Sequence, residues 1–100
     1  MIRSLLVLHA RAGRRDDLLR MLEVLELRAL VEGRHGFLEV EVATAADDQD
    51  EVVIVGSWSS RELYERWLAG PEPDRLLRAV RGLLTADPVS RVYHVVESVS

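Results

Sequence analysis

Hydrophobic positions change their spacing along this chain in an orderly way, and each spacing predicts a type of element. Residues 2–10 are rich in branched aliphatic side chains and are followed by Gly13, which is typical of a first strand. Between residues 14 and 32, leucines recur at helical spacing. Asp16 and Asp17 fall in the first turn, where the helix dipole favours anions, and Gly33 is placed to end the helix.

The second half of the chain continues the pattern. Apolar and charged residues alternate over 37–43, and an acidic loop separates this segment from the apolar run 52–58, which indicates a hairpin with a solvated tip. The stretch from Ser59 to Glu62 has the spacing of a capping box, so a helix should begin directly after Trp58. Gly70 and Pro71 break that helix, a further helix is predicted over 74–84, and a last strand over 89–97.

The order strand, helix, strand, strand, helix, helix, strand describes a single domain, residues 1–100, of the α+β class. It predicts a ferredoxin-like split βαβ sandwich, with four strands and the helices on one face. Residues 5–8 and 52–55 are apolar at every position, so both faces of their strands need cover. The chain has no helices left for the second face, and a second copy packed sheet to sheet would cover it. We therefore expect a homodimer.

Composition narrows the chemistry. Of 100 residues, 48% are hydrophobic and 30% are charged, which is enough for one core only. The net charge of −4 argues against nucleic acid or an anionic membrane surface as a partner, and no apolar segment is long enough to span a membrane. All 13 basic residues are arginine, and the chain has no lysine, asparagine or cysteine. Schiff-base, P-loop lysine and thiolate chemistry are thereby excluded, and a cytoplasmic location is expected.

Several local patterns recur together in one known family. They are the glycine turn at Gly13, Gly36 to Leu38 at the start of the second strand, Trp58 before Ser59 and Ser60, Trp67 with Leu68, and the ending Val92 to Glu97. With these features, over nearly its whole length, the chain resembles the antibiotic biosynthesis monooxygenase family of dimeric α+β barrel proteins. The resemblance implies that two copies form such a barrel.

The resemblance also implies an activity. The quinone-forming members are oxygenases without metal or organic cofactor that act on phenolic polyketides such as anthrones, and the substrate itself reduces molecular oxygen. Their pattern carries over to Trp58, Tyr64 and Arg78, with Arg78 as anion stabiliser. The asparagine of that pattern corresponds to Ile54, so the polar group that would hold the substrate carbonyl is missing.

A pocket can be placed from strand geometry. Alternation puts Ile54, Gly56 and Trp58 on one face, and the missing side chain of Gly56 should leave a gap beside Trp58. The helix that carries Tyr64 and Trp67 would roof this gap. These aromatic residues could equally fill the core. Arg78 falls nearly opposite the apolar stripe of its helix, which favours a solvated arginine.

Histidines are the remaining candidates for proton transfer near neutral pH. His35, at the turn before Gly36, and His94, in the last strand, are the candidate bases, although a strand histidine is more often a packed residue. No histidine has metal-ligand spacing, and the acidic loop lacks the pattern of a calcium site. Trp67 matches a tryptophan of the haem-degrading relatives. Their axial histidine corresponds to Leu77, so the iron ligand is missing.

The leading hypothesis is therefore a homodimeric, cofactor-free monooxygenase for an aromatic or polyketide-type small molecule. Trp58 and Tyr64 would wall the pocket and orient the substrate, while Ile54, Gly56 and Trp67 would contact it. A dimeric barrel that binds a small hydrophobic metabolite without catalysis is the alternative, and Ile54 favours it. An isomerase or cyclase on the same fold would need a base but no oxygen.

Overall fold

The computed structural model describes residues 1–100 as one four-stranded antiparallel sheet with strand order β2-β3-β1-β4. This is the ferredoxin-like α+β fold that the element order predicts. The elements are β1 (Ile2–His9), α1 (Arg15–Val24), α2 (Leu27–Val31), β2 (Phe37–Thr44), β3 (Glu51–Trp58), α3 (Arg61–Leu68), α4 (Glu72–Val80), a short 3-10 turn (Arg81–Leu83) and β4 (Val89–His94).

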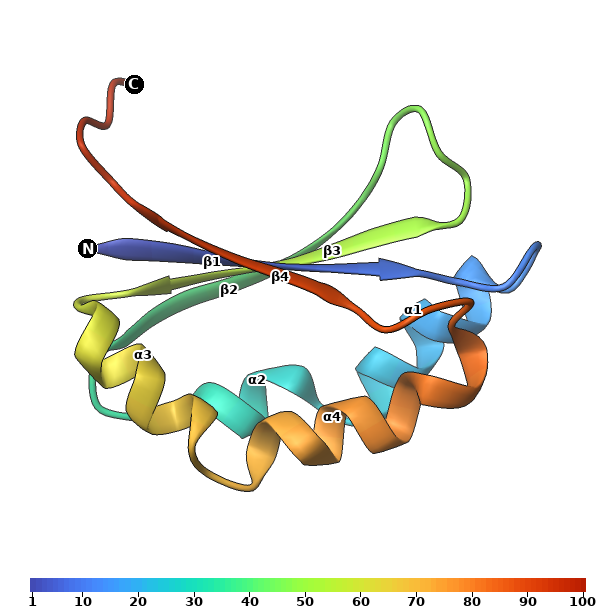
Figure 1. The fold of residues 1–100 in the computed structure, drawn as a ribbon, viewed down its shortest axis with the longest axis horizontal. Helices are drawn as coiled ribbons and strands as arrows, with labels where there is room; N and C mark the ends of the chain where they lie inside the picture. Colours follow the sequence, from blue (N-terminus) through green and yellow to red (C-terminus); the bar gives the residue numbers. More distant parts are fainter.

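All helices lie on one face of the sheet, and no element of the chain covers the other face (Figure 1). The loop between β2 and β3 and the segment after β4 both curve away from the helices, toward the uncovered side. No helix of the structure is both long and apolar enough to cross a membrane.

The pairing of β1 with β3 fixes which side chains face the helices. Ile2 lies opposite Trp58, Ser4 opposite Gly56, and Leu8 opposite Val52. Because strand side chains alternate, these positions share the helix-covered face. The intervening residues point to the uncovered face, and they are Arg3, Leu5, Val7 and His9 on β1 with Glu51, Val53, Val55 and Ser57 on β3.

The core under the helices consists of two separate clusters. The larger contains Leu8, Ala10, Leu18, Leu22, Leu30, Val52, Ile54, Leu76, Val80 and Leu84. The smaller contains Ile2, Val31, Trp58 and Tyr64. Buried apolar side chains therefore pack both ends of the covered face, and neither cluster fills the space between them.

The single helix predicted over 14–32 is wrong, because the chain breaks at Glu26, whose φ of 55° is left-handed. In an unbroken helix Val31 would lie about 140° around the axis from Leu18. The break turns the second segment, so that Leu18 and Val31 are both buried against the sheet. At the start of α1, hydrogen bonds from Arg14 and Arg20 hold the pKa of Asp17 below its usual value.

Other boundaries also move. The helix predicted over 74–84 begins earlier, at Glu72, and ends in the 3-10 turn. The last strand ends at His94 rather than at residue 97. Helix α3 has Ser60 as its N-cap, with the Ser60 hydroxyl accepting from the Leu63 amide at 3.3 Å, so the cap falls one residue after Ser59.

Two contacts hold α3 and α4 in place above the sheet. Gly36 has a φ of 87°, and a side chain there would overlap Leu63 of α3, with the nearest atom 2.5 Å away. Arg34 pairs with Glu72, a carboxylate that is largely buried at the start of α4. Both contacts join the turn before β2 to the helices that roof the covered face.

Candidate functional site

A cavity of about 450 Å³ lies between the sheet and the helices, where the two core clusters meet. It takes Ile54 and Leu76 from the larger cluster and Trp58 and Tyr64 from the smaller one. Its further lining residues are Ser4, Leu5, Leu6, Leu27, Val31, Phe37, Val40, Gly56, Trp67, Leu68, Pro73, Leu77, Arg81, Asp87, Pro88 and Ser90. The lining is thus mostly apolar, with a few polar groups.

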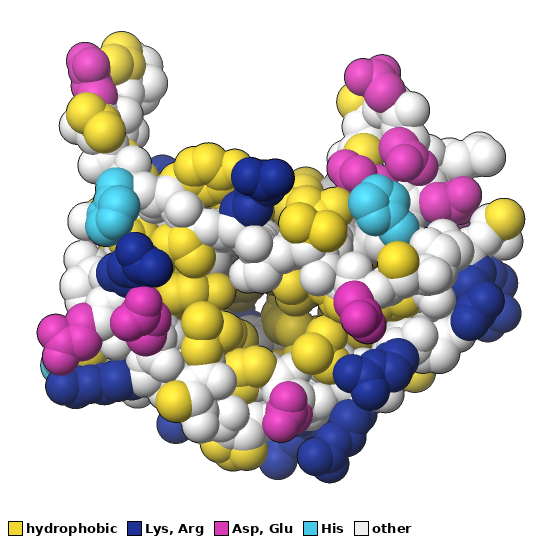
Figure 2. Space-filling model, in the orientation of Figure 1, with side chains coloured by type: hydrophobic (Ala, Val, Ile, Leu, Met, Phe, Trp, Pro, Cys, Tyr) yellow, Lys and Arg dark blue, Asp and Glu magenta, His cyan; other side chains and the backbone are white.

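The cavity opens toward solvent between β4 and the helices. Leu68, Arg81, Asp87 and Ser90 are exposed residues of its lining, and they mark the mouth. Figure 2 shows the molecule hollowed at its centre, with hydrophobic atoms around the opening. A small molecule can therefore reach the interior past one arginine and one aspartate.

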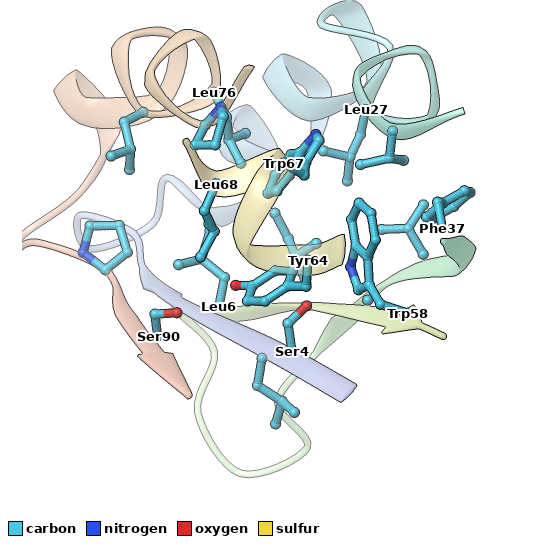
Figure 3. Close-up of a pocket in the computed structure, with 18 of the residues that line it drawn as sticks. Ser4, Leu6, Leu27, Phe37, Trp58, Tyr64, Trp67, Leu68, Leu76 and Ser90 are labelled. Atoms are coloured by element: carbon cyan, nitrogen blue, oxygen red, sulfur yellow. The ribbon is translucent and has the colours of Figure 1, made fainter. Parts of the chain in front are cut away.

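Aromatic rings form one wall of the cavity. Trp58 lies at the centre of this group, with ring centroids 5.6 Å from Phe37, from Tyr64 and from Trp67. Phe37 meets it edge-on, and Tyr64 stacks on Trp67 at 6.3 Å. Such packing holds each ring at a fixed angle. The wall is a rigid surface on which a flat molecule can rest (Figure 3).

The two tryptophans differ in what their indole nitrogens do. Trp67 Nε1 donates to the backbone carbonyl of Leu30 at 3.0 Å, so Trp67 is fixed to α2. Trp58 Nε1 has no partner in the chain, although only 2% of the residue is exposed. No side-chain nitrogen or oxygen is sealed inside the protein without a partner, which places the free N–H of Trp58 at the cavity surface.

Gly56 forms the floor beside Trp58, and the space above it is shared by two polar atoms. A β-carbon on Gly56 would lie 2.7 Å from Ser4 Oγ and 3.2 Å from Trp58 Nε1. The gap predicted beside Trp58 is therefore narrow and polar. Any larger residue at position 56 would displace the Ser4 hydroxyl.

The structure brings together five of the residues singled out from the sequence and leaves three outside. Trp58, Tyr64, Trp67, Ile54 and Gly56 all line the cavity. Arg78, His35 and His94 line no part of it, and all three are exposed. Arg78 lies on the solvent side of α4, two residues after the buried Leu76, as its place on the helical wheel indicates.

Other lining residues have no counterpart in the sequence analysis. Ser4 escapes notice because it is a single polar residue in an apolar strand. Its register, opposite Gly56, is the signal that places it on the covered face. Arg81 and Asp87 reach the mouth because the 3-10 turn and the loop after it pass beside β4, which helical periodicity alone does not show.

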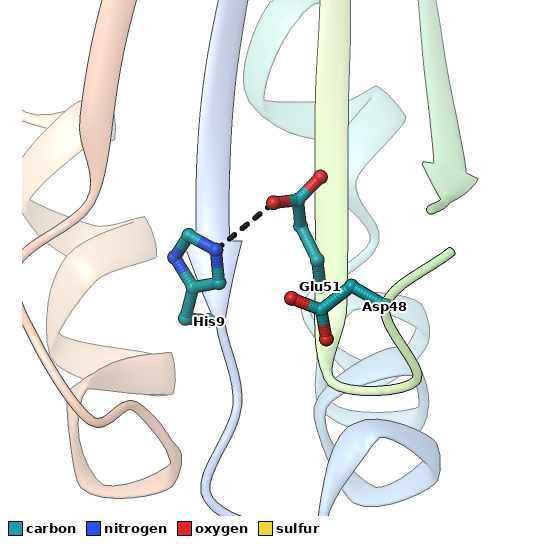
Figure 4. A group of neighbouring side chains, drawn as sticks. All are labelled: His9, Asp48 and Glu51. Atoms are coloured by element: carbon teal, nitrogen blue, oxygen red, sulfur yellow. Dashed lines mark hydrogen bonds and ion pairs between the residues drawn. The ribbon is translucent and has the colours of Figure 1, made fainter. Parts of the chain in front are cut away.

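A second group of ligating side chains lies outside the cavity, at the other end of the sheet. His9, Asp48 and Glu51 have ligand atoms within 4.8 Å of one another (Figure 4). His9 Nε2 and Glu51 Oε1 are 2.9 Å apart across the β1–β3 ladder. Both side chains are partly exposed, and an exposed pair of this kind contributes about 0–1 kcal/mol to stability.

Solved structures share this fold along its whole length. A candidate antibiotic biosynthesis monooxygenase from Deinococcus radiodurans superposes with a TM-score of 0.82 at 20% identity, covering 100% of this chain and 97% of the other. Rv0793 from Mycobacterium tuberculosis gives 0.79 at 18% identity, covering 99% and 98%. A variant of SnoaB, a cofactor-independent oxygenase from Streptomyces nogalater, gives 0.78 at 15% identity, covering 97% and 94%.

Sequence comparison points the same way. No curated protein matches the chain. The model of the family named antibiotic biosynthesis monooxygenase matches residues 1–78, which include β1 to α3 and most of α4. These residues contribute the aromatic wall, the Gly56 floor and Ser4. The chain is a member of the antibiotic biosynthesis monooxygenase family.

Proposed function

We propose that this protein is a cofactor-free monooxygenase that oxidises a flat aromatic or polyketide-type small molecule inside the cavity. The observation that carries the proposal is the aromatic-walled cavity with unpaired polar groups at its surface. Its volume of about 450 Å³ is typical of small-molecule sites. A few placed polar groups in an apolar lining are also typical of such sites.

The volume of the cavity supports its interpretation as a ligand-binding site rather than as a packing defect. A sealed cavity costs about 24 cal/mol per Å³, so 450 Å³ would cost on the order of 10 kcal/mol. The whole stability of a small domain is about 5–15 kcal/mol. The chain avoids this cost by opening the cavity at the mouth, and it keeps a shape that an aromatic ligand would fill.

The reaction that fits is the oxidation of an anthrone-type methylene to a carbonyl. The substrate loses a proton to give an enolate or phenolate, which transfers electrons to molecular oxygen and forms a carbon–oxygen bond. The resulting peroxide loses water. One oxygen atom ends in the new carbonyl, the other leaves in water together with the two hydrogens of the methylene, and the protein supplies no electrons.

The chain's own residues then have limited tasks. Trp58 and Tyr64 wall the substrate and fix its orientation, and the Tyr64 hydroxyl points toward the side of the cavity where Leu6 and Ser90 lie (Figure 3). The proton leaves at the mouth, where Asp87 is the one carboxylate of the lining. Arg78, His35 and His94 take no part, because they do not reach the cavity.

Anthrone oxidation under air and under nitrogen tests the proposal. The purified protein should accelerate quinone formation and oxygen uptake under air, and the acceleration should vanish under nitrogen. Heat-denatured protein and buffer are the controls. No acceleration over buffer overturns the oxygenase activity.

The same assay separates the alternatives. Binding of aromatic molecules without oxygen uptake identifies a non-catalytic binding protein, which the apolar Ile54 in the lining favours. Turnover that continues unchanged under nitrogen identifies an isomerase or cyclase.

We also propose that the protein works as a homodimer through the uncovered face of the sheet. Leu5, Val7, Val53 and Val55 form an apolar centre on this face, each of them only partly buried. The β2–β3 loop and the segment after β4 extend away from the helices at the two sides of this face, where they would contact a second copy packed on it (Figure 1). Light scattering should report twice the chain mass of 11.3 kDa, and a value near 11.3 kDa overturns the dimer.

A further inference from the structure

A second cleft, of about 380 Å³, begins at the mouth of the cavity. Its lining shares Leu77, Arg81, Asp87 and Pro88 with the cavity, so the two spaces adjoin at these residues. The cleft adds a second arginine, Arg11, which comes shortly after β1. A ligand that fills the cavity can therefore extend past the mouth into the cleft.

Hydrogen bonds hold the two arginines of the cleft close to each other. The Arg11 amide donates to the carbonyl of Leu83 at 2.8 Å, and Arg11 Nε donates to the carbonyl of Gly82 at 3.1 Å. Because Gly82 follows Arg81 directly, the Arg11 guanidinium lies beside the turn that carries Arg81. The two bonds also occupy carbonyls at the end of α4, which would otherwise oppose an anion.

Neither arginine has an acidic partner. Five other arginines of the chain form ion pairs, whereas no carboxylate lies within 4.0 Å of Arg11 or Arg81. Asp87 belongs to the same lining but pairs with neither of them. Both arginines are exposed, so an anion from solvent can reach their outer nitrogens. Two neighbouring guanidinium groups without a counter-ion favour an anion that both can bind.

The charge of the cleft selects the kind of anion. With two arginines and one aspartate, the lining carries one net positive charge. A carboxylate balances this charge, and its two oxygens match the fork of N–H donors on a guanidinium. A phosphate monoester carries nearly two negative charges near neutral pH, and the second would meet Asp87. The cleft therefore favours a carboxylate over a phosphate.

We propose that Arg11 and Arg81 form an anion subsite, which binds a carboxylate arm of an aromatic ligand whose rings occupy the cavity. The inference rests on the proposed function for the aromatic class of the ligand. It narrows the substrate to an aromatic carboxylic acid with the acid group at one end, and it adds Arg11, which does not line the cavity, to the binding site.

Two ligands with the same rings test the subsite. Anthraquinone-2-carboxylic acid is ionised at neutral pH, and 2-(hydroxymethyl)anthraquinone is uncharged. The only two tryptophans of the chain, Trp58 and Trp67, both line the cavity, so quenching of tryptophan fluorescence measures how each ligand binds there. The wild-type protein should bind the carboxylate about tenfold more tightly than the alcohol at low salt, and the preference should shrink as salt rises.

Matched variants identify the groups responsible. Arg11→Gln and Arg81→Gln should each lower the affinity for the carboxylate about three- to fivefold and change that for the alcohol by less than about twofold. Arg78→Gln is the control, because Arg78 is exposed on α4 and lines neither space. Asp87→Asn should raise the affinity for the carboxylate, since a repelling charge is removed. Circular dichroism checks that each variant is folded, and the two arginine variants test the subsite independently.

The outcomes also distinguish the anion subsite from the proposed activity. Equal affinity of the wild type for the two ligands overturns the subsite and leaves the oxygenase proposal standing. A loss in Arg78→Gln as large as the losses in Arg11→Gln and Arg81→Gln does the same, because the overall charge then explains the preference. A preference that depends on Arg11 and Arg81, without anthrone oxidation, supports the subsite and overturns the oxygenase. A wild-type protein that binds neither ligand overturns both the subsite and the aromatic substrate.

Discussion

The two faces of the sheet are built from the same kinds of residue and meet different surroundings. On one face, Ile2, Leu8 and Val52 are fully buried by the chain's own helices. On the other, Leu5 and Val55 are only partly buried, and no element covers them. An apolar strand therefore shows that both of its faces need cover, but it does not show whether a helix, a ligand or another chain supplies that cover.

The covered face is itself uneven, because side chains do not fill the space above it along its whole length. Leucine and valine pack the end near α1, while the end near α3 is formed by aromatic rings around a cavity. Rings held against one another can leave a space beside them without collapsing. We therefore propose that the covered face serves stability at one end and ligand binding at the other.

The strongest test of this division is Trp58→Ala. We expect the free energy of unfolding to fall by about 3–5 kcal/mol, because a ring in contact with three other aromatic residues is removed. Affinity for 2-hydroxyanthraquinone, a flat phenolic dye that serves as a binding probe, should fall at least about tenfold, since the aromatic wall is lost. Urea unfolding and dye titration measure the two effects.

Leu18→Ala is the matched control for this variant, because Leu18 is fully buried in the larger cluster and does not line the cavity. It should lower the free energy of unfolding by about 2–5 kcal/mol while dye binding is kept. If Trp58→Ala is destabilised but binds the dye as tightly as the wild type, Trp58 is a core residue and not part of a binding wall.

The uncovered face is tested by Val55→Asp. A carboxylate in the middle of the apolar centre would be buried without a partner in a sheet-to-sheet dimer, so the dimer should dissociate at micromolar concentration. Light scattering should give the monomer mass, and the far-UV circular dichroism should be unchanged.

A valine-to-aspartate substitution on the helical side of the molecule provides the control. Val24 is 78% exposed, and Val24→Asp should leave the dimer intact. A dimer that survives Val55→Asp would show that the interface lies elsewhere on the molecule.

Gly36→Ala tests what holds α3 over the covered face. The left-handed backbone should cost about 1–2 kcal/mol, and Leu63 must move in addition because the new side chain would overlap it. Gly13→Ala is the comparison, since Gly13 is also left-handed but has nothing within 4 Å of its β-carbon position. In urea unfolding, Gly36→Ala should be the more destabilised, and equal losses would show that Leu63 contributes nothing.

The sequence pattern predicts the structure correctly where the short-range periodicity of apolar residues determines which face of an element is buried. Alternation in β3 places Ile54, Gly56 and Trp58 on one face, and helical spacing brings Tyr64 above them, so the aromatic side of the cavity is predictable. The break at Glu26 is not, because no glycine or proline marks it. It arises from the need to bury Val31 as well as Leu18 against one sheet.

The polar side of the cavity could not be predicted for a related reason. Ser4 depends on the register between β1 and β3, and Arg81 depends on where the chain turns after α4. Both are long-range properties that no local pattern reports. The histidines illustrate the converse, since His35 and His94 have suitable chemistry for proton transfer but no path into the cavity.

The smallest effects are expected for Arg78 and Arg81, two arginines near the end of α4 whose side chains lie on different sides of the chain. Arg81 lies at the mouth of the cavity, whereas Arg78 is exposed on the far side of the helix. 2-Hydroxyanthraquinone is an anion once its phenol ionises, and it must pass the mouth. Arg81→Ala should therefore weaken binding of the ionised dye about two- to threefold at low salt, and the effect should fade as salt screens the charge. Arg78→Ala, the same change three residues earlier, should have no effect on dye binding or on anthrone oxidation. If Arg78→Ala instead lowers the oxidation rate while Arg81→Ala does not, then α4 turns its other face to the substrate in the working protein. The mouth would then have to be placed on the opposite side of that helix.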